Sequence, residues 1–147
     1  MNQTTQVRFQ AALAALALFA GAGCGSSPIV PERVEPALAA TFANLVHRQV
    51  PAMGLAPMTV SEFAVRANCN KLLGGIDKGS GEWLCTIMWQ GPEGRLLRNT
   101  YDLFVTTDGC YLATVDGEAL GGPTLKTRDG REVKNLLHTF EGCFDTT

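Results

Sequence analysis

The sequence predicts an α+β domain in which one amphipathic helix near the N-terminus packs on an antiparallel β-sheet of four or five strands, cross-linked by two disulfides. Three observations predict this class. One segment repeats apolar residues at helical spacing, later segments alternate apolar and polar residues as half-buried strands do, and four cysteines lie among those segments. We therefore expect a single core between the helix and one face of the sheet.

The start of the chain is predicted to be an export signal that ends in a cysteine. The apolar run over residues 11–20 follows Arg8, and about ten residues are too few to cross a hydrocarbon core of about 30 Å, so the run is typical of a cleaved signal. Residues 21–24 resemble a bacterial lipobox at its last three positions; ordinary cleavage, which leaves Cys24 as a free thiol, is the alternative. Cysteine parity favours the lipoprotein, since lipid on Cys24 leaves an even number of the five cysteines.

These features predict the organisation of the whole chain. We expect residues 1–23 to be a lipoprotein signal peptide, and Cys24 to carry acyl chains, palmitate among them, that anchor the protein outside the cell membrane. Residues 24–36, rich in proline and serine, are expected to be a flexible tether, and residues 37–147 a single domain. The net charge of −2 without a basic patch excludes a nucleic-acid partner.

The helix is predicted over residues 35–50. Pro36 suits the first turn of a helix, and Pro51 should close it. Apolar residues recur there every three or four positions and so share one face; they are Leu38, Phe42, Leu45 and Val46.

Three alternating segments are predicted as strands, at residues 61–70, 83–89 and 97–105. A glycine-rich link over residues 71–81 and a turn at residues 91–94 should connect them. The inward side chains are expected to be Phe63, Val65, Ala67 and Cys69, then Trp83, Cys85, Ile87 and Trp89, then Leu97, Tyr101, Leu103 and Val105. The opposite face should carry a polar set made of Arg66, Asn68, Thr86, Arg98, Thr100 and Asp102.

The Asp-Gly pair at residues 108–109 predicts a β-hairpin with a two-residue type I′ turn. In that register Val105 faces Leu112, and Cys110 lies on the inward face. Residues 124–127 are expected to form a short strand. Residues 131–141 fit a short helix by apolar spacing and a strand by alternation, and both alternatives stay open.

Four cysteines allow three pairings. Cys69 and Cys85 share an inward parity on successive strands, whereas Cys110 and Cys143 would join the last segment to the sheet. We therefore expect the disulfides Cys69–Cys85 and Cys110–Cys143. No two of these cysteines have the C-x-x-C spacing common to redox and zinc sites, so we expect no metal.

Residues 81–86, 101–111 and 135–145 resemble a family of small uncharacterised lipoproteins from high-GC Gram-positive bacteria. The marks that carry the resemblance are a Trp-x-Cys strand at residues 83–85, the Asp-Gly hairpin, and Phe-Glu-Gly at residues 140–142. The resemblance covers residues 60–145. It implies the fold and the extracytoplasmic location, and no activity or catalytic motif is assigned to the family.

The sequence shows no catalytic constellation. His47 and His138 have no carboxylate, cysteine or second histidine at helical spacing. There is no G-x-S-x-G nucleophile elbow, and the glycines of residues 74–81 lack the Gly-Lys-Ser/Thr ending of a phosphate loop. We therefore expect no catalytic residue, no cofactor and no enzyme activity.

The function that the sequence favours is a non-enzymatic binding or accessory module outside the membrane, with an envelope protein as its partner. A helix packed on one face of a sheet leaves the other face open, as in cystatin-like α+β modules, and the polar set is expected there. Two alternatives remain: a small-ligand carrier with a pocket between helix and sheet, and an envelope hydrolase without a recognisable motif.

Overall fold

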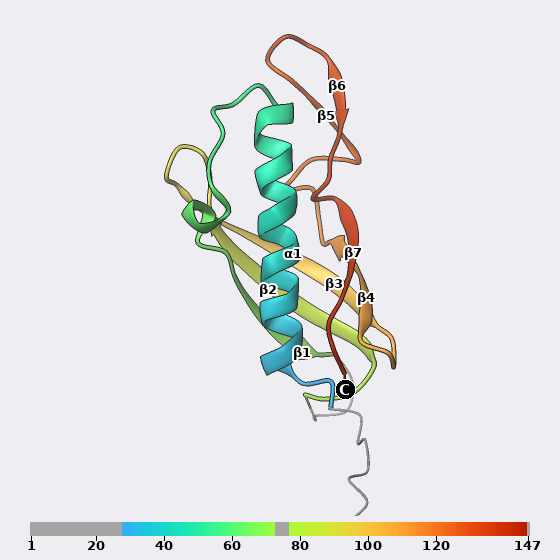
Figure 1. Cartoon of the computed structure of the whole chain (residues 1–147). Helices are drawn as coiled ribbons and strands as arrows, with labels where there is room; N and C mark the ends of the chain where they lie inside the picture. The colour runs from blue at the N-terminus through green and yellow to red at the C-terminus, as the bar shows by residue number, and fades with distance from the viewer. Residues whose placement is uncertain (1–27, 73–76, 147) are drawn as a thin grey trace, which may run out of the picture.

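One helix lies across one face of a five-stranded antiparallel sheet (Figure 1), so the predicted α+β class is confirmed. The structure, a computed structural model, describes residues 28–72 and 77–146; the expected signal peptide and Cys24 lie outside these residues. Helix α1 spans Pro31–Ala52. The sheet has the order β1-β2-β3-β4-β7, with strands at Arg66–Lys71, Gly81–Gln90, Leu96–Val105, Cys110–Val115 and Thr139–Cys143.

Smaller elements complete the domain. The 3-10 helix η1, Val60–Phe63, precedes β1. The strands β5, Thr124–Lys126, and β6, Glu132–Lys134, pair with each other in a separate hairpin beyond the end of α1 (Figure 1). The short strand expected at residues 124–127 is therefore confirmed.

Helix α1 begins at Pro31, five residues before the predicted start at Pro36. Residues 31–36 are therefore helical and are not an extended tether. The reason is burial, because Ile29 and Val34 both lie in the core. Burying two such side chains contributes about 1.5–3 kcal/mol each, which together offsets the hydrogen bond that Pro36 cannot donate inside the helix.

The first turns of α1 also protect an edge of the sheet. Strand β1 is an edge strand, and the backbone groups of such edges invite unwanted pairing when they are left open. The Cys69 amide donates a hydrogen bond to the Glu35 carboxylate, with 2.8 Å between N and Oε1. A helix side chain thus replaces the missing neighbouring strand at this point.

The core between α1 and the sheet is rich in aromatic rings. Phe42, in the middle of α1, makes edge-to-face contacts with Trp89 and Tyr101, whose ring centroids lie 5.6 Å and 5.9 Å away. This geometry is favourable for aromatic pairs. Trp83 and Trp89 are both buried, so the alternation predicted for β2 is confirmed.

The first strand is shorter than predicted. Residues 60–63 form η1 because Thr59 and Glu62 make a capping box, in which the Thr59 amide donates to the Glu62 carboxylate over 2.6 Å. Phe63 is buried, as expected, but from a 3-10 turn and not from a strand. The predicted alternation of burial therefore holds from Phe63 to Asn70, but the strand itself begins only at Arg66.

The Asp-Gly hairpin is present, but its turn is not the predicted one. The Thr106 amide donates to the Cys110 carbonyl over 2.8 Å, so the loop holds three residues. Within it, Gly109 has a φ of 82° and Asp108 does not have a positive φ, whereas a type I′ turn needs positive φ at both positions. The Asp108 carboxylate accepts hydrogen bonds from the Thr106 hydroxyl and the Cys110 amide, and these bonds favour the wider loop.

The longer turn shifts the register of the hairpin by one residue. Val105 pairs with Tyr111 and not with Leu112, so Cys110 and Leu112 lie on the face opposite to the predicted one. Tyr111 points into the core instead, where its hydroxyl lies 2.9 Å from Thr41 Oγ1 in α1. The prediction that Cys110 faces inward was therefore wrong.

Residues 131–141, left open between helix and strand, contribute to two strands, β6 and β7. Gly142 lies within β7, directly opposite Tyr111. A Cβ atom at Gly142 would overlap the Tyr111 hydroxyl, so only glycine leaves room for this ring. The glycine therefore marks a close approach between two strands and not the end of a helix.

Both predicted disulfides are present, and each joins residues directly opposite on neighbouring antiparallel strands. Cys69–Cys85 links β1 to β2 and is buried; we call it the core disulfide. Cys110–Cys143 links β4 to β7 on the other face of the sheet, where Cys143 is exposed; we call it the outer disulfide.

The two ends of the domain are formed by different segments (Figure 1). At the end where α1 begins, the proximal end, the Gly79 amide donates to the Ile29 carbonyl over 2.7 Å and the Arg33 guanidinium donates to the Asp145 carbonyl. The turn between β2 and β3 and the β5–β6 hairpin lie at the opposite, distal end. The 22 residues of α1 correspond to about 33 Å between the two ends.

Candidate functional site

The candidate site is the outer face of the sheet, which α1 does not cover. Strand alternation brings every second side chain to this face. All six members of the polar set predicted for it lie there, and each is exposed or half-buried. The sequence therefore predicted this part of the face correctly.

The strand register arranges the outer face in rows that run across the strands. The Phe104 row, at the proximal end, contains Leu72, Glu82, Phe104, Leu112 and Glu141. The next, the Leu84 row, contains Asn70, Leu84, Asp102, Thr114 and Thr139. A row of Asn68, Thr86 and Thr100 follows, and then the Arg98 row of Arg66, Met88 and Arg98.

The outer face carries an unusual share of exposed apolar side chains. Of the six large hydrophobic residues exposed in the described part of the chain, five lie here, namely Leu72, Met88, Leu96, Phe104 and Leu112. Phe104 and Leu112 are direct neighbours across β3 and β4, with 56% and 48% of their surface accessible. Clustered apolar exposure of this kind marks interaction surfaces, whereas single exposed side chains need no explanation.

The charges on the outer face are separated by sign. Glu82, Asp102 and Glu141 belong to the two proximal rows, and Arg66 and Arg98 to the Arg98 row. The ion pair between Arg131 and Asp129, with 2.7 Å between Nε and Oδ2, lies in the β5–β6 turn and not on this face. None of these five face charges is therefore neutralised by an ion pair with another described residue.

Sequence reasoning missed the apolar part of the site. Phe104 shares its parity with Thr100 and Asp102, so strand alternation contained a usable signal for it. Leu112 was placed inside by the one-residue register error at the hairpin. Leu72 lies one residue beyond the end of β1, in the segment that had been expected to be a link.

The outer disulfide borders the Phe104 row. Phe104, Leu112 and Glu141 line a shallow groove of about 400 Å³ together with both cysteines of this disulfide. The disulfide holds β7 against β4, which fixes Glu141 beside Leu112. It therefore stabilises the site from one side without occupying it.

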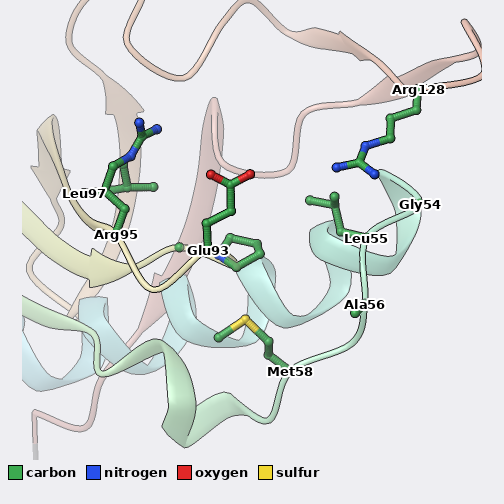
Figure 2. Close-up of a pocket in the computed structure, with 10 residues that line it drawn as sticks. Gly54, Leu55, Ala56, Met58, Glu93, Arg95, Leu97 and Arg128 are labelled. Carbon is green, nitrogen blue, oxygen red and sulfur yellow. The ribbon is translucent and has the colours of Figure 1, made fainter.

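A second candidate is a groove of about 450 Å³ at the distal end (Figure 2). Leu55, from the loop after α1, is part of its apolar lining. At its mouth the Glu93 carboxylate stands between the side chains of Arg95 and Arg128. All three charged residues are exposed, so water screens them and each would contribute little to the binding of a ligand.

The histidines do not form a site. His47 Nδ1 lies 2.7 Å from the Met58 carbonyl oxygen, and His138 Nδ1 lies 3.1 Å from Thr139 Oγ1. The two rings belong to separate elements, α1 and the loop before β7. Among the described residues, no group of three or more His, Cys, Asp or Glu side chains is placed to hold a metal ion.

Shifted pKa values do not mark a catalytic cleft in the described residues. Hydrogen bonds from Thr127 and then from Arg131 lower the pKa of Asp129 to about 2, in the turn between β5 and β6. Burial raises the pKa values of Tyr101 and Tyr111, which lie in the core. Active sites gather such groups in one cleft, whereas these three lie in a surface turn and in the packed interior.

Comparison of the chain with protein-family models, with curated proteins and with solved structures gave no match. No helix among residues 28–72 and 77–146 combines the length and the apolar character that a membrane crossing requires.

Proposed function

We propose that this chain is a lipoprotein, anchored on the extracytoplasmic side of the cell membrane through lipid on Cys24, and that it acts as a non-enzymatic binding module. Its partner docks on the outer face of the sheet. The proposal rests on the five exposed apolar side chains gathered on that face. When a partner covers such a surface and removes it from water, the free energy falls, which favours binding.

The rigidity of the outer face supports a binding role. Its residues stand on strands that are hydrogen-bonded into one sheet, and the core and outer disulfides cross-link the two margins of that sheet. A surface that is already ordered loses little conformational entropy when it binds. The distal groove is lined mainly by loop and turn residues, with Leu97 of β3, and neither disulfide cross-links these loops.

The two disulfides also support the proposed location. Disulfides form and persist in oxidising compartments outside the cytoplasm. The intact mass of protein extracted from its native membrane tests the anchor. We expect a mass that begins at Cys24, includes acyl chains and is four hydrogens lighter than the reduced chain. A mass that begins at Gly23 with a free thiol would contradict the anchor.

Photo-cross-linking in cells tests the binding face. The full-length protein would carry a photoreactive phenylalanine analogue at Phe104 in one variant and at Val60 in another. Val60 is a matched control, because it is an exposed apolar residue that lies in η1 and not on the outer face. We expect a discrete adduct from position 104 and none from position 60. Adducts from position 60 alone would refute the outer face as the binding surface.

A further inference from the structure

We infer that the partner presents a segment whose apolar side chains are flanked by lysines or arginines, and that this segment docks across the Phe104 and Leu84 rows. This inference rests on the proposed function. It specifies the chemistry of the partner, which the binding role alone leaves open.

The composition of the two proximal rows carries the inference. Their large apolar side chains are Leu72, Leu84, Phe104 and Leu112, and their charged side chains are Glu82, Asp102 and Glu141. Every charge in these rows is negative. A complementary partner therefore offers apolar groups and positive charge at the same place.

The arginines of the outer face do not neutralise these acids. On β3, Arg98 lies four residues from Asp102 and six from the Phe104 row, which corresponds to about 13 Å and about 20 Å along a strand. The Debye length at physiological salt is about 8 Å, so charges at those separations are largely screened from each other. The proximal rows are therefore acidic, and the positive side chain at their β7 margin is Lys134, which lines a groove with Leu112, Thr139 and Glu141.

The spacing within the Phe104 row determines the desolvation penalty for a partner that lacks positive charge. Neighbouring strands lie about 4.8 Å apart, so Glu82 lies immediately beside Phe104, and Glu141 immediately beside Leu112. A partner that covers the apolar side chains must also remove water from these carboxylates. An acidic or neutral partner would leave them desolvated and unpaired, which is unfavourable, whereas lysine or arginine would pair with them.

The same charges disfavour two other occupants. Two copies anchored in one membrane both direct their proximal ends toward it, so face-to-face packing would place each Phe104 row against its equivalent and bring like charges together. An anionic lipid surface would be repelled by Glu82, Asp102 and Glu141. A basic, apolar protein segment avoids both penalties.

A pair of designed peptides provides the test. The Phe104 row crosses five strands, about 19 Å, which matches a helix of about 13 residues. The probes are two amphipathic helical peptides of this length, identical in their leucine face, with lysines on the flanks of one and glutamates on the flanks of the other. Binding is measured with the lipidated protein reconstituted in zwitterionic nanodiscs.

We expect the leucine–lysine peptide to bind at least tenfold more tightly than the leucine–glutamate peptide, and its affinity to fall as salt is raised. Phe104→Ser should weaken it about tenfold through lost apolar burial. The triple variant E82K/D102K/E141K should weaken it about tenfold or more through lost charge pairing. The matched control R66E/R98E, a charge reversal on the same face, should not weaken it. Unchanged circular-dichroism melting shows that each variant is folded.

Several outcomes would overturn the inference. They are equal binding of the two peptides, binding of the lysine peptide that no face variant changes, and weakening by R66E/R98E in place of the triple variant. Sedimentation of a dimer that Phe104→Ser abolishes would show a second copy as the occupant. Binding to lipid vesicles that Phe104→Ser abolishes would show the bilayer as the occupant.

The cross-linking experiment separates this inference from the proposed function. If position 104 gives a partner adduct in cells while the peptides show no preference for lysine, the outer face is a binding surface and the partner chemistry is wrong. If position 104 gives no adduct, the binding role of the face falls, and the inference falls with it.

Discussion

Replacing Gly142 with alanine should destabilise the domain by about 2 kcal/mol, although the same change normally stabilises a strand. At a compatible site alanine gains about 0.5 kcal/mol by reducing the entropy of the unfolded chain. Here a Cβ atom would overlap Oη and Cζ of Tyr111 and would lie 3.0 Å from Thr41 Oγ1. Overpacking costs about 1–3 kcal/mol, and loss of the hydrogen bond between Tyr111 and Thr41 costs about 1 kcal/mol more.

Urea denaturation measures this effect as a lower midpoint at constant m-value. Gly122→Ala is the matched control, because no heavy atom lies within 4 Å of its Cβ position, and its effect should stay within about 0.5 kcal/mol. In a Tyr111→Leu background, which lacks the overlapping atoms, Gly142→Ala should cost less than about 0.5 kcal/mol. If the cost of Gly142→Ala is the same in both backgrounds, the overlap with Tyr111 is not its cause, and the reasoning is refuted.

Three further predictions concern the sheet margins and the β5–β6 turn. Under native conditions dithiothreitol should reduce the outer disulfide before the core disulfide, because Cys143 is exposed while both cysteines of the core disulfide are buried. Alkylation followed by mass spectrometry measures the order of reduction, and simultaneous reduction of both disulfides would contradict the prediction. Glu35→Ala should lower the free energy of unfolding, measured by urea denaturation, by about 1 kcal/mol, because the Cys69 amide loses its hydrogen-bond acceptor. Glu35→Gln should retain most of the stability, and an equal loss in both variants would show that this hydrogen bond does not contribute. The pKa of Asp129 is about 2 in the folded protein and 3.8 ordinarily, so the ionised carboxylate stabilises the fold above about pH 4, and this stabilisation is lost as the pH falls toward 2. Asp129→Asn should remove that part of the pH dependence of the urea midpoint. An unchanged pH profile would show that ionisation of Asp129 does not contribute to stability.

The parts of the fold that the sequence predicted well are those where side-chain burial repeats with a clear period. In β2 the alternation of large apolar and polar residues predicted both the strand and its buried face, because a one-residue error would expose two tryptophans. The same period placed Cys69 and Cys85 together on one side and so predicted the core disulfide.

The errors arose where a local hydrogen bond or a distant contact outweighs the local pattern. At the hairpin, the side-chain bonds of Asp108 select a three-residue loop, and nothing in the Asp-Gly pair distinguishes this loop from the two-residue turn. At the start of α1, burial of Ile29 and Val34 against the rest of the domain extends the helix into a segment whose prolines indicate a tether. The burial of Ile29 and Val34 depends on residues far along the chain, so it is not visible in a window of neighbouring residues.

The candidate site shows the same division. The polar set on the outer face followed from strand parity and is confirmed. The prediction of which apolar residues lie on this face depended on the hairpin register. The one-residue register error therefore placed Leu112 in the core and hid its pairing with Phe104. A correct turn assignment would have revealed two adjacent exposed apolar side chains on a face expected to be polar.

Burial of Ile29 determines how far the domain can stand from its anchor. Five residue steps separate Cys24 from Ile29, and a fully extended chain of that length spans at most about 18 Å. With lipid on Cys24, as proposed, the domain searches for its partner in the plane of the membrane and not through the depth of the envelope. A partner anchored in the same membrane is then met at a raised effective concentration, as when a short linker joins two binding modules, whereas a freely diffusing partner gains nothing from the anchor.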